Sequence, residues 1–152
     1  MFHSAVEPVL LPPEPEEIEP SDLRLAVKPR ILLIEDNDLI AETMETALIE
    51  EGFRVVGIAD TADRAVKLAR IYHPDLAVTD IRLSGPCDGI EAAMQILRET
   101  GARSIFATGH LDKVTARRCA QAQPLGWLTK PYTPSQLVEA VRQAMTSVEV
   151  EA

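Results

Sequence analysis

The stretch 31-ILLIED-36 runs four apolar residues directly into two acids, and 76-LAVTD-80 repeats this arrangement. Two further stretches, 104-SIFAT-108 and 126-GWLTK-130, are also short apolar runs that end on a polar side chain. Unbroken apolar runs of this length are typical of parallel strands that are buried on both faces. The four stretches therefore predict a parallel sheet with polar residues gathered at one edge.

Amphipathic segments alternate with these runs, which predicts five strands and five helices. In the first helix Leu39, Ile40, Met44 and Leu48 lie on one apolar stripe, which we expect to face the core. Right-handed crossovers between parallel strands then favour a doubly wound α/β sheet. The expected strands are 31–34, 53–59, 76–79, 104–108 and 126–129, and the expected helices are 39–52, 61–73, 90–101, 110–123 and one from Thr133 or Ser135 to about Ser147.

Four of the five strands deliver polar side chains to the carboxyl edge of the sheet, where such folds bind ligands. These side chains are Glu35, Asp36, Asp80, Thr108 and Lys130. Each has an ordinary explanation when taken alone, such as capping a helix or forming a turn. Together, however, three carboxylates raise one another's pKa unless a cation lies among them, and one lysine does not neutralise three acids. The cluster therefore predicts a Mg²⁺ site.

With a cation in place, a carboxylate at this edge can attack phosphorus and form an acyl phosphate. Asp80 is the best candidate because it ends the central strand, with the other polar groups arriving from neighbouring strands. Lys130 and the metal would supply the positive charge that phosphoryl transfer needs, and Thr108 would donate a hydrogen bond to a phosphoryl oxygen.

The sequence resembles the receiver domain of two-component response regulators over residues 30–147. Four motifs carry the resemblance, in order and on the expected elements: ILLIED, LAVTDIRL, FATG and LTKPY. It implies a flavodoxin-like five-stranded sheet of order 2-1-3-4-5 with five helices. It makes Asp80 the phosphoacceptor, and it places Mg²⁺ on Asp36, Asp80 and the backbone carbonyl of Arg82, with Glu35 assisting.

The resemblance also implies roles around the phosphoryl group. Thr108 would be the switch hydroxyl, and Lys130 would be the phosphate-binding lysine before a cis Pro131. Trp127 takes the aromatic switch position, where receivers commonly have Tyr or Phe; a packed aromatic without switch action is the alternative.

Two smaller features follow from the same resemblance. Arg82 and His110 lie two residues beyond Asp80 and Thr108, at positions that tune the lifetime of the phosphoryl group in receivers, although solvated surface residues are the alternative. Gly109 completes the FATG motif, which resembles a subset of alphaproteobacterial single-domain receivers tied to general stress signalling.

The expected partners are proteins. A sensor histidine kinase or a histidine phosphotransfer protein would be the phosphodonor. A downstream protein would bind the face formed by the helix at 110–123, the strand at 126–129 and the last helix. There Arg117, Arg118 and Trp127 form a small basic and aromatic patch, for which ordinary helix surface is the alternative. A phosphate sink or a phosphorelay intermediate remain alternative functions.

Two rival functions fit the residues less well. A scaffold pseudo-receiver would have lost the phosphoacceptor, an acid or the lysine, and all are retained. A haloacid dehalogenase-type phosphatase needs a second acid two residues after its nucleophile, where this chain has Arg82. We therefore expect a signalling protein rather than an enzyme, with Mg²⁺-dependent self-phosphorylation and autodephosphorylation as its own chemistry.

Composition sets the remaining expectations for this chain of 152 residues. Its net charge of -9 argues against nucleic-acid binding, and no apolar run approaches the ~18 residues of a membrane span, so we expect a cytoplasmic protein. Residues 1–29 hold six prolines and six acids and predict a flexible extension, either a solvated leader or a docking segment anchored by Val9, Leu10 and Leu11. Residues 30–147 would form the receiver domain and 148–152 a C-terminal tail, with signalling through protein contacts alone.

Overall fold

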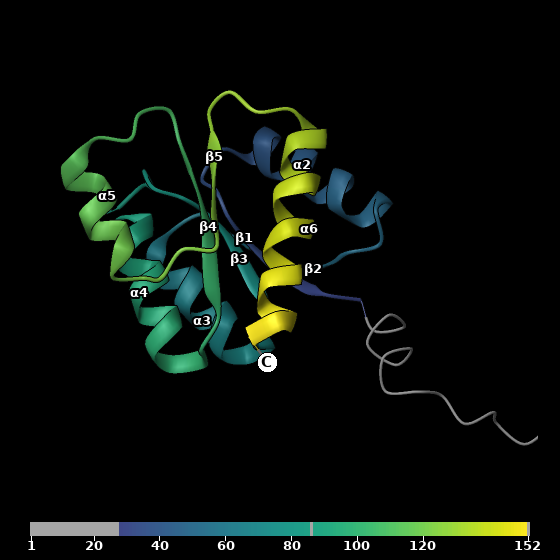
Figure 1. Cartoon of the computed structure of the whole chain (residues 1–152), viewed down its shortest axis with the longest axis horizontal. Helices are drawn as coiled ribbons and strands as arrows, with labels where there is room; N and C mark the ends of the chain where they lie inside the picture. Colours follow the sequence, from purple (N-terminus) through teal and green to yellow (C-terminus); the bar gives the residue numbers. More distant parts are fainter. Residues whose placement is uncertain (1–27, 86, 152) are drawn as a thin grey trace, which may run out of the picture.

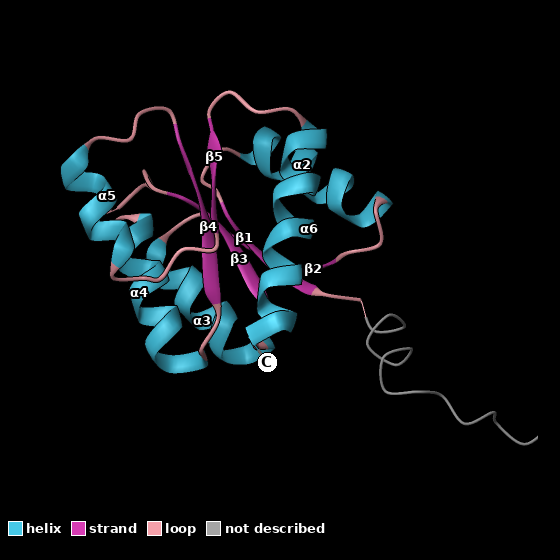
Figure 2. Cartoon of the chain, in the orientation of Figure 1, coloured by secondary structure: helices cyan, strands magenta, loops and turns pink. Residues whose placement is uncertain are grey.

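Five strands form one parallel sheet of order β2-β1-β3-β4-β5 in the computed structural model, which describes residues 28–85 and 87–151 (Figure 2). This order and the five accompanying helices confirm the predicted flavodoxin-like fold. Residues 1–27 of the predicted extension, including the possible anchors at 9–11, lie outside the described residues. The strands are β1 (Arg30–Ile34), β2 (Arg54–Ala59), β3 (Leu76–Asp80), β4 (Arg103–Thr108) and β5 (Gly126–Thr129), and the helices are α2 (Asp38–Glu50), α3 (Ala62–Tyr72), α4 (Gly89–Thr100), α5 (Lys113–Ala120) and α6 (Pro134–Glu151).

The helices cover both faces of the sheet, with α2 and α6 on one side and α3, α4 and α5 on the other (Figure 1). Alternate residues of β1 therefore enter different cores: Ile31 and Leu33 pack with α2 and α6, whereas Leu32 and Ile34 pack with α3 and α4. All four side chains are fully buried. Burial on both faces is the physical reason why this strand is apolar without interruption.

Helices α5 and α6 differ most from the predicted boundaries, and α5 also ends early, at Ala120 instead of position 123. Helix α5 begins at Lys113 rather than near His110, because Asp112 is its N-cap and accepts a hydrogen bond from the Thr115 N–H at 2.7 Å. Helix α6 continues to Glu151, beyond the expected end near Ser147, since the sequence there contains no glycine or proline to stop it. Within residues 28–85 and 87–151, no helix combines the length and the apolar character that crossing a membrane requires.

The apolar stripe of α2 faces the core only in part. Met44 and Leu48 are buried as predicted, but Leu39 is 73% exposed and Ile40 is 39% exposed. The expectation for these two residues was wrong because the first turn of α2 lies at the carboxyl edge of the sheet. There they line an apolar groove of about 520 Å³ with Tyr132 and other residues of the β5–α6 connection.

Candidate functional site: an acidic pocket at the carboxyl edge

Asp80, the last residue of β3, lies at the centre of the pocket and is only 6% exposed. The ammonium group of Lys130, which follows β5, lies 2.8 Å from Asp80 Oδ2, and the Arg82 N–H donates to Asp80 Oδ1 at 3.2 Å. Helix α4 starts directly against this residue, since a Cβ on Gly89 would lie 1.8 Å from the Asp80 carbonyl oxygen. The carboxylate is therefore held through both oxygens, at a position that the backbone packing fixes.

Two more acids, Glu35 and Asp36, reach the same place from the end of β1. Carboxylate oxygens of Glu35, Asp36 and Asp80 all lie within 4.8 Å of one another. Glu35 is 3% exposed, and this burial, together with the charge of Asp80, raises its pKa to about 7. Two effects lower the pKa of Glu35 but do not cancel the rise. The Asn37 N–H donates to Glu35 Oε1 at 3.1 Å, and Lys130 contributes its positive charge. The pocket thus holds more negative charge than its lysine offsets.

These residues fit a bound Mg²⁺. The cluster offers three hard oxygen donors that lie within 4.8 Å of one another, and only one lysine, Lys130, is paired with these acids. Asp36 and Asp80 would hold the ion, with Glu35 close by. Mg²⁺ in this position would offset negative charge on the oxygens of a transferring phosphoryl group. A role for the Arg82 carbonyl as a further ligand stays a prediction.

A hollow of about 290 Å³ opens above Asp80. Because one water molecule takes about 30 Å³ of liquid, the hollow has room for a phosphoryl group and several waters. Arg82 and His110, the two predicted tuning residues, line it together. The other lining residues are Asp80, Ile81, Thr108, Gly109 and Lys130.

The two predicted switch residues have partners other than Asp80. The Thr108 hydroxyl donates to the His110 carbonyl at 2.9 Å and accepts from the His110 N–H at 3.2 Å, so the β4–α5 loop engages it. Trp127 is 38% exposed and packs its ring against buried Phe106, with 5.7 Å between the centroids. Contact between Thr108 and a phosphoryl group would require these loop hydrogen bonds to break.

Lys130 joins the pocket to the apolar groove beside α2. Its side chain contacts Asp80, and the residue also lines the groove of about 520 Å³ that contains Leu39 and Ile40. The Lys130–Pro131 peptide bond is cis, the isomer that the resemblance implied.

The sequence matches the family described as the response regulator receiver domain over residues 31–142. The chain belongs to this family. Receivers are in general signalling domains rather than enzymes. The chain is 32% identical to the transcriptional regulatory protein PdtaR of Mycobacterium tuberculosis over 126 residues, which is 83% of this chain and 61% of PdtaR. It is also 32% identical to the phyllosphere-induced regulator PhyR of Methylorubrum extorquens, over 76% of this chain and 43% of PhyR.

The solved structures agree with these matches. The receiver domain of a modulated diguanylate cyclase from Desulfovibrio desulfuricans G20 aligns with a TM-score of 0.76 at 32% identity, covering 83% of this chain and all of that one. The response regulator PhyR from Brucella abortus aligns with a TM-score of 0.70 at 31% identity, covering 82% of this chain and 51% of that one. The PhyR matches fit the subset that the FATG motif suggested. The chain spans about half the length of the curated relatives it matches.

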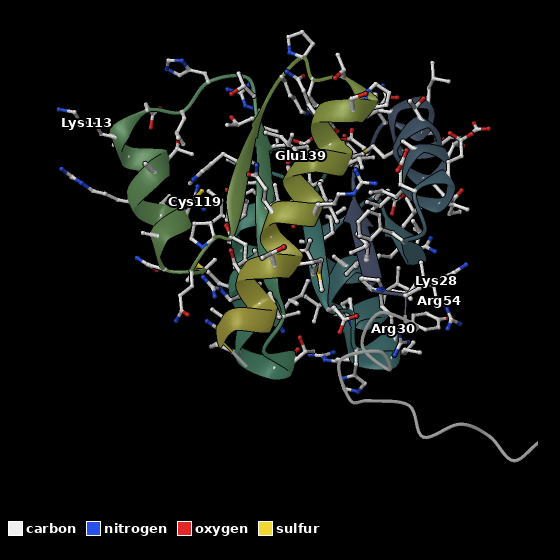
Figure 3. The ribbon with its side chains drawn as sticks, turned by 45° about the vertical axis from the view of Figure 1, so that its right-hand side comes forward. Lys28, Arg30, Arg54, Lys113, Cys119 and Glu139 are labelled. Atoms are coloured by element: carbon white, nitrogen blue, oxygen red, sulfur yellow. The ribbon has the colours of Figure 1, made fainter. Side chains whose placement is uncertain are left out.

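The predicted basic patch of this receiver is arranged differently from the expectation. Arg118 is paired with Asp88 at 2.8 Å and lies 3.8 Å from Glu91, so it links α5 to the start of α4 while its side chain stays 43% exposed. Lys113 and Arg117 are exposed on α5, and Figure 3 shows Lys113 extending away from the rest of the molecule. The apolar part of this surface is larger than predicted, because Leu111 and Val114 are also exposed.

Two residues near the pocket were missed by sequence reasoning. Ser84 donates a hydrogen bond to Asp36, and the hydroxyl of Tyr132 is buried with no hydrogen-bond partner. Burial and the charges of Glu35 and Asp80 raise the pKa of Tyr132 to about 12. Ser84 carries no sequence signal, because it lies in a loop without periodicity. Tyr132 ends the LTKPY motif, but the motif does not tell that its hydroxyl is buried.

Proposed function

We propose that this receiver accepts a phosphoryl group on Asp80 from a phosphohistidine of a sensor kinase or a histidine phosphotransfer protein. The observation that carries the proposal is the placement of Asp80. Its carboxylate lies against Lys130, within an acid cluster that fits Mg²⁺ and below a hollow with room for a phosphoryl group.

The transfer is a displacement at phosphorus. An Asp80 oxygen forms the new O–P bond while the N–P bond breaks, and the imidazole leaves with the electron pair of that bond. The Arg82 N–H and the Lys130 ammonium orient the carboxylate before attack, so little reorganisation is needed. Lys130 then faces the phosphoryl oxygens, and Thr108 becomes their hydrogen-bond donor once it leaves the His110 backbone.

The apolar groove beside α2 is the surface on which the phosphodonor docks. It adjoins the pocket, and exposed Leu39 and Ile40 offer a partner apolar area that the fold itself leaves uncovered. A donor bound in the groove lies next to Asp80, because Lys130 borders both the groove and the acidic pocket.

The signal leaves through protein contacts at the face of α5, β5 and α6. Exposed Leu111, Val114 and Trp127 are accompanied there by Lys113 and Arg117, an arrangement that suits a partner with apolar and acidic groups. The net charge of -9 disfavours direct contact with nucleic acid. A phosphorelay intermediate and a phosphate sink use the same Asp80 chemistry and differ only in where the phosphoryl group goes next.

The test is phosphotransfer from the candidate histidine kinases of the source organism, with time courses in both directions. Wild type and Asp63→Asn, a matched change on the exposed surface of α3, should take up base-labile label, and Asp80→Asn should not. Return of label to the donor would indicate a relay, and rapid loss as inorganic phosphate would indicate a sink. Undiminished label on Asp80→Asn would refute the assignment.

A further inference from the structure

Ser84 makes a direct contact with one of the acids of the pocket. Its hydroxyl donates to Asp36 Oδ2 at 3.0 Å, from the loop that connects β3 to α4. Lys130 engages Asp80 and a backbone N–H engages Glu35, so each of the three acids has a donor of its own. Asp36 differs from the other two because it is exposed.

The backbone of Ser84 is fixed independently of this hydrogen bond. Ser84 forms an isolated parallel bridge with Thr61, and Thr61 is the N-cap of α3, where its side chain accepts from the Arg64 N–H at 3.2 Å. Leu83, the preceding residue, packs against the core on the α3 and α4 side of the sheet. The loop therefore presents the hydroxyl to Asp36 from a position tied to helix α3.

We propose that Ser84 is a positioning residue that holds Asp36 in place for Mg²⁺, a role that rests on the proposed function. An exposed carboxylate samples several rotamers unless a partner selects one, and a hydroxyl selects a rotamer without neutralising the charge that the metal requires. The hydrogen bond uses one lone pair of Oδ2, so Oδ1 and the remaining lone pair of Oδ2 stay available to the ion. When a metal ligand loses such a hydrogen-bond partner, metal affinity typically falls about 10-fold to 100-fold.

The experiment measures Mg²⁺ affinity from the Mg²⁺ dependence of the melting temperature, with the metal alone as the probe. Ser84→Ala should weaken binding at least about tenfold. Ser84→Thr, which keeps the hydroxyl, should restore affinity close to that of the wild type. Ser135→Ala, a matched change at an exposed position on α6, should leave it unchanged. In EDTA the melting temperatures of wild type and Ser84→Ala should agree, since the role concerns the ion rather than the fold.

A double-mutant cycle identifies the residue through which Ser84 acts. In an Asp36→Asn background, Ser84→Ala should cause little further loss of Mg²⁺ affinity. An equal loss in both backgrounds, or a wild-type affinity in Ser84→Ala, would overturn the positioning role while leaving the proposed function intact. A wild-type protein that binds no Mg²⁺ would overturn both.

Discussion

Replacing Glu35 with glutamine should stabilise the metal-free receiver at alkaline pH. Glu35 is almost fully buried beside Asp80, and its pKa is raised from 4.5 to about 7. Between these two values the native protein keeps a proton that the unfolded chain has released, so stability falls as the pH rises through this window and levels off above it. One pKa unit corresponds to about 1.4 kcal/mol, so a shift from 4.5 to about 7 places the total loss at about 3.5 kcal/mol at most.

Glutamine keeps the shape of the side chain and its acceptor for the Asn37 N–H but removes the charge. The free energy of unfolding of Glu35→Gln in EDTA should therefore match that of the wild type near pH 5 and exceed it near pH 8. Mg²⁺ should reduce or reverse this difference in unfolding free energy at pH 8. The wild-type cluster carries one more negative charge, so binding of the ion stabilises it more than it stabilises Glu35→Gln. Urea unfolding at several pH values, with and without Mg²⁺, measures both effects.

The control is Glu42→Gln, the same chemical change on the exposed surface of α2. It should shift stability by no more than about 0.5 kcal/mol at any pH. If the difference between Glu35→Gln and wild type were the same at pH 5 and pH 8, within that margin, burial of a charged Glu35 would not be the source of strain in the pocket.

Three further predictions concern the metal, the switch and the buried hydroxyl. Millimolar Mg²⁺ should raise the melting temperature of the wild type and have little effect on Asp36→Ala; equal shifts in thermal melts would count against the site. Beryllofluoride with Mg²⁺ should change the emission of Trp127, the single tryptophan in the chain, and Thr108→Ala should blunt that change. An undiminished response would mean that Trp127 reports the bound charge directly. Tyr132→Phe should raise the free energy of unfolding by about 1–3 kcal/mol, because it removes a buried hydroxyl without a partner; chemical denaturation checks this, and a lower stability would indicate an ordered water on that hydroxyl.

The sheet and its acidic edge could be predicted because they depend on local patterns. Residues 31–34 are apolar on both faces, which identifies a parallel strand, and the acids at the ends of β1 and β3 must then lie at the carboxyl edge. Thr61 and Thr133 were also recognisable as helix caps, and both accept the expected hydrogen bonds from backbone N–H groups. Each of these inferences needs only a few consecutive residues.

The remaining features depend on which elements meet in space. Leu39 belongs to the apolar stripe of its helix by periodicity, and only the position of the first turn of α2 leaves it exposed. Arg118 and Asp88 are thirty positions apart, and the helix pattern does not tell which face of α5 lies against α4. Ser84 reaches Asp36 across 48 positions. Sequence periodicity identifies the faces of an element, but it does not identify the neighbour of each face.

The position of Lys130 has a consequence for the proposed transfer. The same residue salt-bridges Asp80 and borders the groove beside α2. If the proposed transfer takes place, the ammonium group of Lys130 would turn to the new phosphoryl oxygens, and the wall of the groove would change with it. We would then expect a donor that fits the unphosphorylated receiver to meet an altered surface and to dissociate after transfer. One side chain would in this way link the occupancy of Asp80 to the residence time of the donor.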